Sequence, residues 1–293
     1  MVYVIRVLCM LAYVVLAPFL GGILSGMDRK LSARMQGRIG PSVFQPFHDL
    51  YKLLKKQILV VNRYQIMLLL SFLVMVVGTG ALFFGGFDLL LVFFVLTTAC
   101  MFFVLAATVT NSPYAELGAQ RELIQMLAYE PMILLTAVGF FMANGSFKAV
   151  DAFTADLPAI VQLPGVFIGL VFVLTIKLRK SPFDLSTSHH AHQELVKGVT
   201  TEFSGGLMAI VELSHLYENV FLLGLIALFF VSSSWWSIPL AIVGALVVWF
   251  VEVLIDNTSA RVKWNQMLSS AWIMTAIFGG GNLLVLEIIR LLS

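Results

Sequence analysis

Acidic side chains occur inside or at the edges of long apolar runs in this sequence. Carboxylates are expensive to bury in a membrane, so each one is a candidate functional residue, and chains of them serve as proton relays. The set comprises Glu122, Glu130, Glu202, Glu212, Glu218, Glu252, Asp256 and Glu287. The residue types therefore indicate a path for protons or cations.

Three of these acids are the stronger candidates. Glu130 precedes Pro131, which removes a backbone donor and loosens the helix at that point. Glu130, Glu202 and Glu212 are expected toward one side of a helical bundle. If they lie close together, the protonation of each depends on the others, as a relay requires.

The remaining acids leave two interpretations open. Glu252 and Asp256 are four residues apart and share a helix face, as do Glu212 and His215, which are three apart. We include Glu252 and Asp256 in the expected ion path. The alternative is a structural ion pair or a contact at the membrane surface, chiefly for Glu122, Glu218 and Glu287.

Histidines and cysteines give no specific metal signal. His189, His190 and His192 are close together, but this spacing is not typical of a particular metal and too few other ligands accompany them. Cys9 and Cys100 stand alone inside apolar runs and form no CxxC motif. We therefore expect no metal site and no redox centre in this chain.

The elements that position these acids are predicted to be membrane-spanning helices. Of the 293 residues, 60% are hydrophobic and 12% are charged, about half the charged fraction of a soluble domain. Apolar runs of about 20 residues match the thickness of a bilayer. The sequence predicts a single polytopic domain over 1–293, an all-α integral membrane protein of about eight transmembrane helices. The expected spans lie near 2–25, 65–85, 89–110, 123–143, 162–180, 205–231, 236–256 and 268–291.

The basic residues predict how the chain is oriented. The loops at 26–64, 111–122, 181–204 and 257–267 fall on one side, and 15 of the 18 Lys and Arg residues lie on that side. The other three are Arg6, Lys148 and Arg290. Basic loops face the cytoplasm, so these loops are predicted to be cytoplasmic. In the first loop, Phe44, Phe47, Tyr51 and Leu54 recur at helical spacing, which predicts an interfacial amphipathic helix.

Four segments resemble a known family in their order and residues. They are DRKLSARMQGRIGPSVFQPFHDLYKLLKK (28–56), NSPYAELGAQRELIQMLAYE (111–130), the stretch from Arg179 to Glu212 with Pro182-Phe183-Asp184, Glu194-Leu195, Gly198 and Glu202-Phe203-Ser204, and RVKWNQMLSSAW (261–272). The chain resembles the eight-helix membrane subunit of respiratory complex I and its homologues in membrane-bound [NiFe] hydrogenases. The motifs cover roughly half of the chain.

Departures from the complex I pattern favour the hydrogenase branch. Gly40-Pro41 is followed quickly by Gln45-Pro46, whereas the complex I subunit has extra residues between these two motifs. Asn265 stands where complex I usually has Asp, and Asp28 where it has Glu. The chain is therefore more similar to the energy-converting, group 4 hydrogenases of the formate-hydrogenlyase type.

The resemblance implies a membrane-anchoring and ion-coupling subunit that makes no chemical bond itself. Its partners would be a large subunit with a NiFe centre, a small subunit with [4Fe-4S] clusters and an antiporter-like membrane subunit. Ferredoxin or formate would supply electrons for hydrogen formation, coupled to H⁺ or Na⁺ export across a prokaryotic plasma membrane.

The resemblance also suggests roles for residues. Asp184, Glu194 and Arg179 would lie near the docking face for the partner subunits, and Glu130, Glu202 and Glu212 would continue the path into the bundle. Residues expected to order the loops and to bind partners are Asp28, Arg29, Arg34, Arg38, Asp49, Lys52, Arg121, Arg179 and Arg261. Two other functions remain open: the quinone-site subunit of complex I and a stand-alone ion transporter.

Overall fold

A computed structural model describes residues 2–180, 182–187 and 194–292, and its ordered elements are all helices. In chain order these are α1 (Val2–Met35), α2 (Gln45–Lys55), α3 (Arg63–Phe84), α4 (Leu89–Thr108), α5 (Pro113–Asn144), η1 (Ala149–Phe153), α6 (Ala159–Gln162), α7 (Pro164–Lys177), η2 (Gly198–Thr200), α8 (Gly205–Leu228), α9 (Ser237–Thr258), α10 (Trp264–Met274), η3 (Thr275–Gly280) and α11 (Gly281–Leu292). The predicted all-α class is confirmed.

Seven helical segments of the described chain are long and apolar enough to cross a membrane. The last of them is a single helix from Trp264 to Leu292, in which η3 is a π-helical segment. The sequence predicts about eight spans, and the one expected at 162–180 is shorter than predicted. It is α7, with 14 residues and a length of about 21 Å. Pro164 lies in its first turn, where a proline ends the preceding helix and starts a new one.

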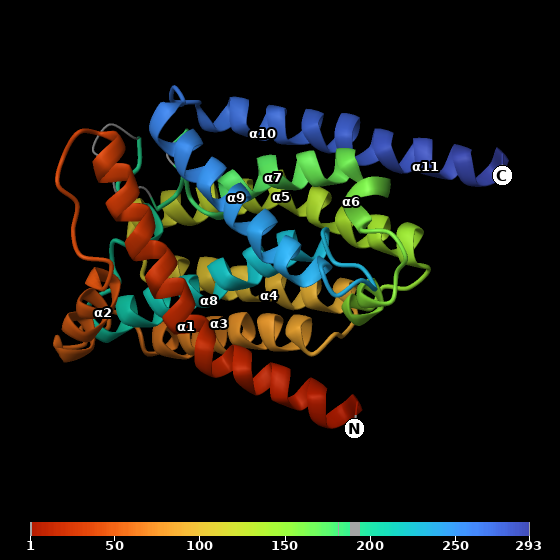
Figure 1. Ribbon diagram of the computed structural model, residues 1–293. Helices are drawn as coiled ribbons and strands as arrows, with labels where there is room; N and C mark the ends of the chain where they lie inside the picture. Colours follow the sequence, from red (N-terminus) through yellow and green to blue (C-terminus); the bar gives the residue numbers. More distant parts are fainter. Residues whose placement is uncertain (1, 181, 188–193, 293) are drawn as a thin grey trace.

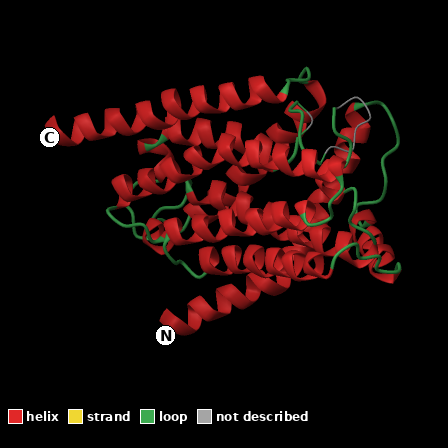
Figure 2. Cartoon of the chain, turned by 180° about the vertical axis from the view of Figure 1, so that it is seen from behind, coloured by secondary structure: helices red, strands yellow, loops and turns green. Residues whose placement is uncertain are grey.

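Most of the long helices run roughly parallel or antiparallel to one another, whereas α1 and α9 cross the bundle obliquely (Figure 1). α3 and α4 form a tight antiparallel hairpin, whose turn includes Gly86 in a left-handed conformation with φ of 71°. The side chain of Asp88 accepts a hydrogen bond from Leu90 N and caps α4. Viewed from the opposite side, both chain termini lie at the end of the bundle away from α2 (Figure 2).

The short helix α2 lies at the opposite end of the bundle from the termini (Figure 1). It is strongly amphipathic, and the ring of Phe47 packs against Gly22 of α1. Arg29 of α1 donates a hydrogen bond of 2.8 Å to Asp49 of α2, which also accepts from Gln45. An amphipathic helix is therefore present in the first long loop, as predicted, and α1 holds it in place.

The outer surface of the bundle is more apolar than the surface of a water-soluble protein. Large hydrophobic residues are more than half exposed on α1, α9 and α11, for example Leu11, Val243 and Ile288. The interior is filled by aromatic side chains such as Phe72 and Phe103, whose ring centroids are 5.1 Å apart. Contiguous apolar surface on this scale indicates contact with lipid or with other membrane subunits.

Candidate functional site

A buried ion pair joins α7 to α8 in the interior of the bundle. The Nζ atom of Lys177 lies 2.6 Å from Oε1 of Glu218, and both side chains are almost fully buried. His215, one turn earlier on α8, places its Nδ1 atom 3.3 Å from the second carboxylate oxygen of Glu218. Both charges are thus compensated inside a low-dielectric environment, where an unpaired charge is strongly unfavourable.

A second ion pair lies beside the first, nearer the loop that follows α7. Arg179 Nη2 is 3.3 Å from Oε1 of Glu122, a buried residue of α5. Ser186 donates a hydrogen bond to the other oxygen of Glu122, and Arg179 donates to Thr187. Residues of the loop therefore contact the same carboxylate and guanidinium that face the interior. We call Glu122, Lys177, Arg179, His215 and Glu218 the central cluster.

Local geometry explains how these side chains meet. Glu122, Gln125 and Tyr129 follow one another at intervals of three and four residues, so they share one face of α5. Arg179 has a φ of 56°, which is uncommon for a residue other than glycine. This left-handed turn directly after α7 directs the guanidinium back toward α5, with its Cζ atom 5.4 Å from the centroid of the Phe103 ring.

Polar groups of the central cluster surround a small internal cavity. Its volume is about 10 Å³, room for about one water molecule. Cys100 and Tyr129 also line it: Tyr129 donates to the Cys100 sulfur at 3.5 Å, and Lys177 Nζ lies 3.3 Å from that sulfur. The cavity has the donors and acceptors that a bound water requires.

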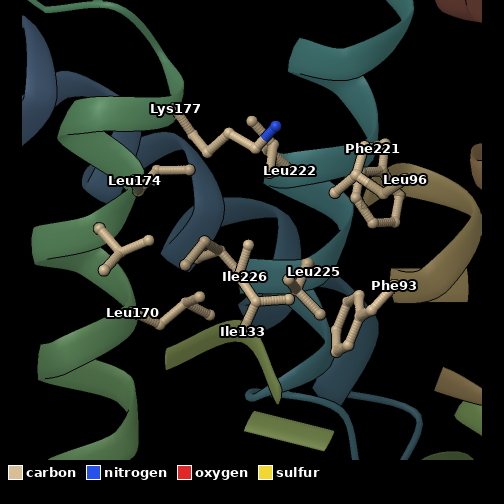
Figure 3. Close-up of a pocket in the computed structure, with 11 residues that line it drawn as sticks. Phe93, Leu96, Ile133, Leu170, Leu174, Lys177, Phe221, Leu222, Leu225 and Ile226 are labelled. Atoms are coloured by element: carbon tan, nitrogen blue, oxygen red, sulfur yellow. The ribbon is translucent and has the colours of Figure 1, made fainter. Parts of the chain in front are cut away.

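Lys177 also borders a second, apolar cavity of similar size. Figure 3 shows its side chain reaching from α7 across this cavity, above Leu174 and Ile226 and beside Leu222. The ammonium group therefore stands at the boundary between the polar centre of the bundle and its apolar interior.

A lateral cluster connects α1, α9 and the residues after α7. It consists of Asp28, Lys180, Glu252 and Asp256. Lys180 Nζ lies 2.5 Å from Asp28 Oδ2 and 3.7 Å from Asp256 Oδ2. Glu252 is completely buried one turn before Asp256, and neither of its carboxylate oxygens has a hydrogen-bond partner within the described parts of the chain.

The hydroxyl of Thr175 lies near the Glu252 carboxylate. The same hydroxyl lies 3.5 Å from the carbonyl oxygen of Val171, and no hydrogen bond of good geometry to Glu252 is present among the described residues. The lateral cluster thus holds three acids and one lysine, and its most deeply buried acid is the one without a hydrogen bond.

A loop cluster fixes the segment around η2. Buried Asp184 accepts from Arg261 at 3.1 Å and from the backbone N of Glu194. Glu194 in turn lies 2.6 Å from Arg121, whose guanidinium stacks over Trp264 at 4.4 Å. Asp184, Glu194, Arg121 and Arg261, which were predicted from three separate sequence segments, are therefore brought together.

No hydrogen bond or ion pair joins Glu130, Glu202 and Glu212 to one another among the residues that the structure describes. Glu130 is half-buried and accepts a 3.0 Å hydrogen bond from Thr97 of α4, because it lies one residue beyond the face that carries Tyr129. Glu202 contributes its backbone carbonyl to Gln65 at 3.5 Å. Glu212 is half-buried on α8, and His215 pairs with Glu218 rather than with it.

The remaining predicted loop residues are mostly at the surface. Arg34, Arg38 and Lys52 are exposed, and Arg38 donates to Gln36 at 2.8 Å. The sequence indicates no site role for Lys177, and it favours a structural role for Glu122 and Glu218. Their signal in the sequence is weak, because the pairing partners lie 41 and 57 positions apart.

Metal ligands are not evident in the part of the chain that the structure describes. No group of three or more His, Cys, Asp or Glu side chains there is placed to hold an ion. His189, His190 and His192 lie outside the described residues.

Comparisons with known proteins identify the family. The pattern that defines the NADH dehydrogenase family matches residues 6–287. The chain belongs to the NADH dehydrogenase family. Relatives include hydrogenase-4 component C of Escherichia coli (strain K12), 29% identical with 90% of each chain covered. An NADH-quinone oxidoreductase subunit of Geobacillus kaustophilus (strain HTA426) is 30% identical, covering 90% of this chain and 86% of the relative.

A solved structure shares the fold of this family member. It comes from the membrane-bound sulfane sulfur reductase, an archaeal respiratory membrane complex, with a TM-score of 0.84 and 22% identity. The match covers 96% of this chain and 99% of that one. The predicted resemblance to hydrogenase and complex I membrane subunits is confirmed, and the protein is a multi-pass membrane subunit of this family.

Proposed function

We propose that this chain is the membrane-anchoring and ion-coupling subunit of a ferredoxin- or formate-linked energy-converting [NiFe] hydrogenase. The observation that carries the proposal is the central cluster. Glu122 and Arg179 contact Ser186 and Thr187 of the loop, while Lys177 and Glu218 lie behind them in the bundle. Ionisable groups thus extend from the loop end of the molecule into its buried interior.

In this proposal the loop cluster and α2 face the hydrogenase subunits. A large subunit with the NiFe centre and a small subunit with [4Fe-4S] clusters dock there, on the cytoplasmic side of a prokaryotic plasma membrane. An antiporter-like subunit packs against the apolar flank. The exposed basic residues Arg34, Arg38 and Lys52 suit a docking surface or the headgroup layer, since both attract cations.

Coupling in this scheme is electrostatic. A change of charge at the docked subunit alters the field at Asp184, Glu194 and Arg121, which are joined by one ion pair and one backbone hydrogen bond. Arg179 then changes between its contact with Thr187 of the loop and its contact with Glu122. This change alters whether a proton is held more favourably by Glu122 or by Glu218. Interacting sites of this kind share protons as a group. Glu130, Glu202, Glu212, Glu252 and Asp256 extend the path into other helices.

The test compares Glu122→Gln and Glu218→Gln with Glu130→Gln, Glu202→Gln and Glu212→Gln in membrane vesicles. Glu287→Gln is the matched control, because Glu287 is exposed on α11. Hydrogen formation and ion uptake are measured together. We expect the two cluster variants to lose ion uptake by tenfold or more. Unchanged uptake in all five variants contradicts the coupling role.

A complex I-type quinone reductase is the second candidate, because several relatives are subunits of NADH-quinone oxidoreductases. The short spacing from Gly40-Pro41 to Gln45-Pro46 favours the hydrogenase. Purification of the complex through this subunit separates the two. Nickel and two co-purifying hydrogenase subunits support the hydrogenase, whereas bound quinone without nickel supports the alternative.

A further inference from the structure

An apolar groove opens on the bundle at the end away from α2. It lies between α1, α8, α9, η1 and the end of α3 with the turn that joins α3 to α4, and its volume is about 460 Å³. Cys9, Phe84, Val150, Ala227, Ala241 and Ile242 are among the residues that line it. The size falls within the range of ligand sites, and the lining is that of a site for a hydrocarbon chain.

One charged side chain faces this groove. Arg6 is the only charged residue in the described lining, and its buried Nε atom has no hydrogen-bond partner among the described residues. A guanidinium with an unsatisfied buried donor is unfavourable unless an acceptor binds it. Arginine forms its strongest pairs with phosphate and carboxylate groups, by two parallel hydrogen bonds. The groove is therefore lined mainly by apolar residues, and Arg6 gives it one group that can bind an anion.

Two tryptophans near the groove indicate the depth of Arg6 in the membrane. Trp235 and Trp236 are 70% and 65% exposed, directly before α9, whose Ile238 and Ala241 line the groove. Exposed tryptophans gather where the bilayer meets water. Arg6 lies in the second turn of α1, at the same end of the bundle as the termini (Figure 1). Its guanidinium is thus at the level of lipid headgroups.

We propose that this groove is a binding site for an anionic phospholipid. One acyl chain fills the apolar groove, and the phosphate accepts hydrogen bonds from Arg6. Zwitterionic lipids fit less well, because the described lining offers no carboxylate for their ammonium group. This site is separate from the central cluster and does not depend on the proposed coupling function.

The experiment uses the full chain, purified with its complex and reconstituted in nanodiscs of equal parts phosphatidylglycerol and phosphatidylcholine. Lipids that remain bound after transfer to detergent are counted by native mass spectrometry. We expect the wild type to retain phosphatidylglycerol preferentially. Arg6→Gln should reduce that preference about fivefold, the typical effect of one basic residue at the membrane surface. Arg6→Lys keeps the charge and should preserve most of it.

Two further variants make the result specific. Arg290→Gln removes an exposed arginine at the same end of the bundle but outside the groove lining, and it should leave the preference unchanged. Cys9→Trp adds bulk at an exposed position of the groove and should abolish retention of both lipids. An unchanged preference in Arg6→Gln overturns the proposal. So does a photoreactive probe on Cys9 that crosslinks to a protein subunit in the complex instead of to lipid.

Discussion

The Nζ atom of Lys177 and the Oε1 atom of Glu218 are 2.6 Å apart inside the bundle, where both side chains are shielded from solvent. The pair bridges the short helix α7 and α8, the most buried of the long apolar helices. Removing one partner leaves the other as an uncompensated buried charge. Removing both leaves an apolar contact of similar size. These two changes separate a structural role from a functional one.

Glu218→Gln is therefore expected to destabilise the protein by roughly 3–5 kcal/mol, the usual effect of breaking a buried ion pair. The double variant Lys177→Met/Glu218→Met should recover most of this stability, because two apolar groups replace two paired charges. Thermal unfolding in detergent measures both. If the double variant also restores ion uptake in vesicles, the pair is structural and takes no part in coupling.

Glu252→Leu should stabilise the protein by about 1–3 kcal/mol, because it removes a carboxylate that is buried without a hydrogen bond from the described residues. Glu252→Gln leaves a buried amide in the same place and should change the stability little. Ion uptake should fall if this acid belongs to the path. Asp256→Asn is the comparison, since Asp256 is partly exposed beside Lys180. A loss of stability in Glu252→Leu shows that the carboxylate has a stabilising partner.

Gly118→Val should detach the segment around η2 from α5, because a Cβ atom at Gly118 meets the backbone of Gly198 and Val199. The expected readout is faster proteolytic cleavage between residues 181 and 204. Gly78→Ala is a suitable control on α3, where an added Cβ meets no atom within 4 Å. Equal cleavage of both variants argues against this packing contact.

Tyr114→Phe should loosen the same segment in a different way. The Tyr114 hydroxyl donates to Val196 O at 3.0 Å and accepts from Val196 N at 2.9 Å. Losing two partly exposed hydrogen bonds typically removes about 1 kcal/mol. Hydrogen exchange at Val196 should accelerate about fivefold, whereas exchange in the interior of α8 should not change.

The sequence predicts the architecture better than it predicts the central cluster. Apolar runs give the helices directly, and the spacing of Phe44, Phe47 and Tyr51 gives α2. Those patterns are local, and each follows from one helix facing lipid or a neighbour. The helix α7 is shorter than the predicted span of 162–180, because Pro164 starts a new helix after α6 and the left-handed Arg179 follows its end at Lys177.

The central cluster depends on contacts between distant segments. From the sequence, Lys177 and Arg179 are interpreted as basic residues at the edge of the membrane, because positive charges near a span usually lie there. The left-handed backbone of Arg179 directs its guanidinium toward Glu122 of α5, and the packing of α7 against its neighbours places Lys177 beside Glu218. Glu130, in contrast, is prominent in the sequence beside Pro131 but faces Thr97 on α4.

The helix α1 runs without interruption from Val2 to Met35. Arg6, which lines the apolar groove, and Asp28, which pairs with Lys180, are 22 residues apart on this helix, so the path along the helix between them, which includes Pro18, is about 33 Å long. The hydrocarbon layer of a bilayer is about 30 Å thick. The stretch of α1 between these two charged residues is therefore long enough to cross that layer.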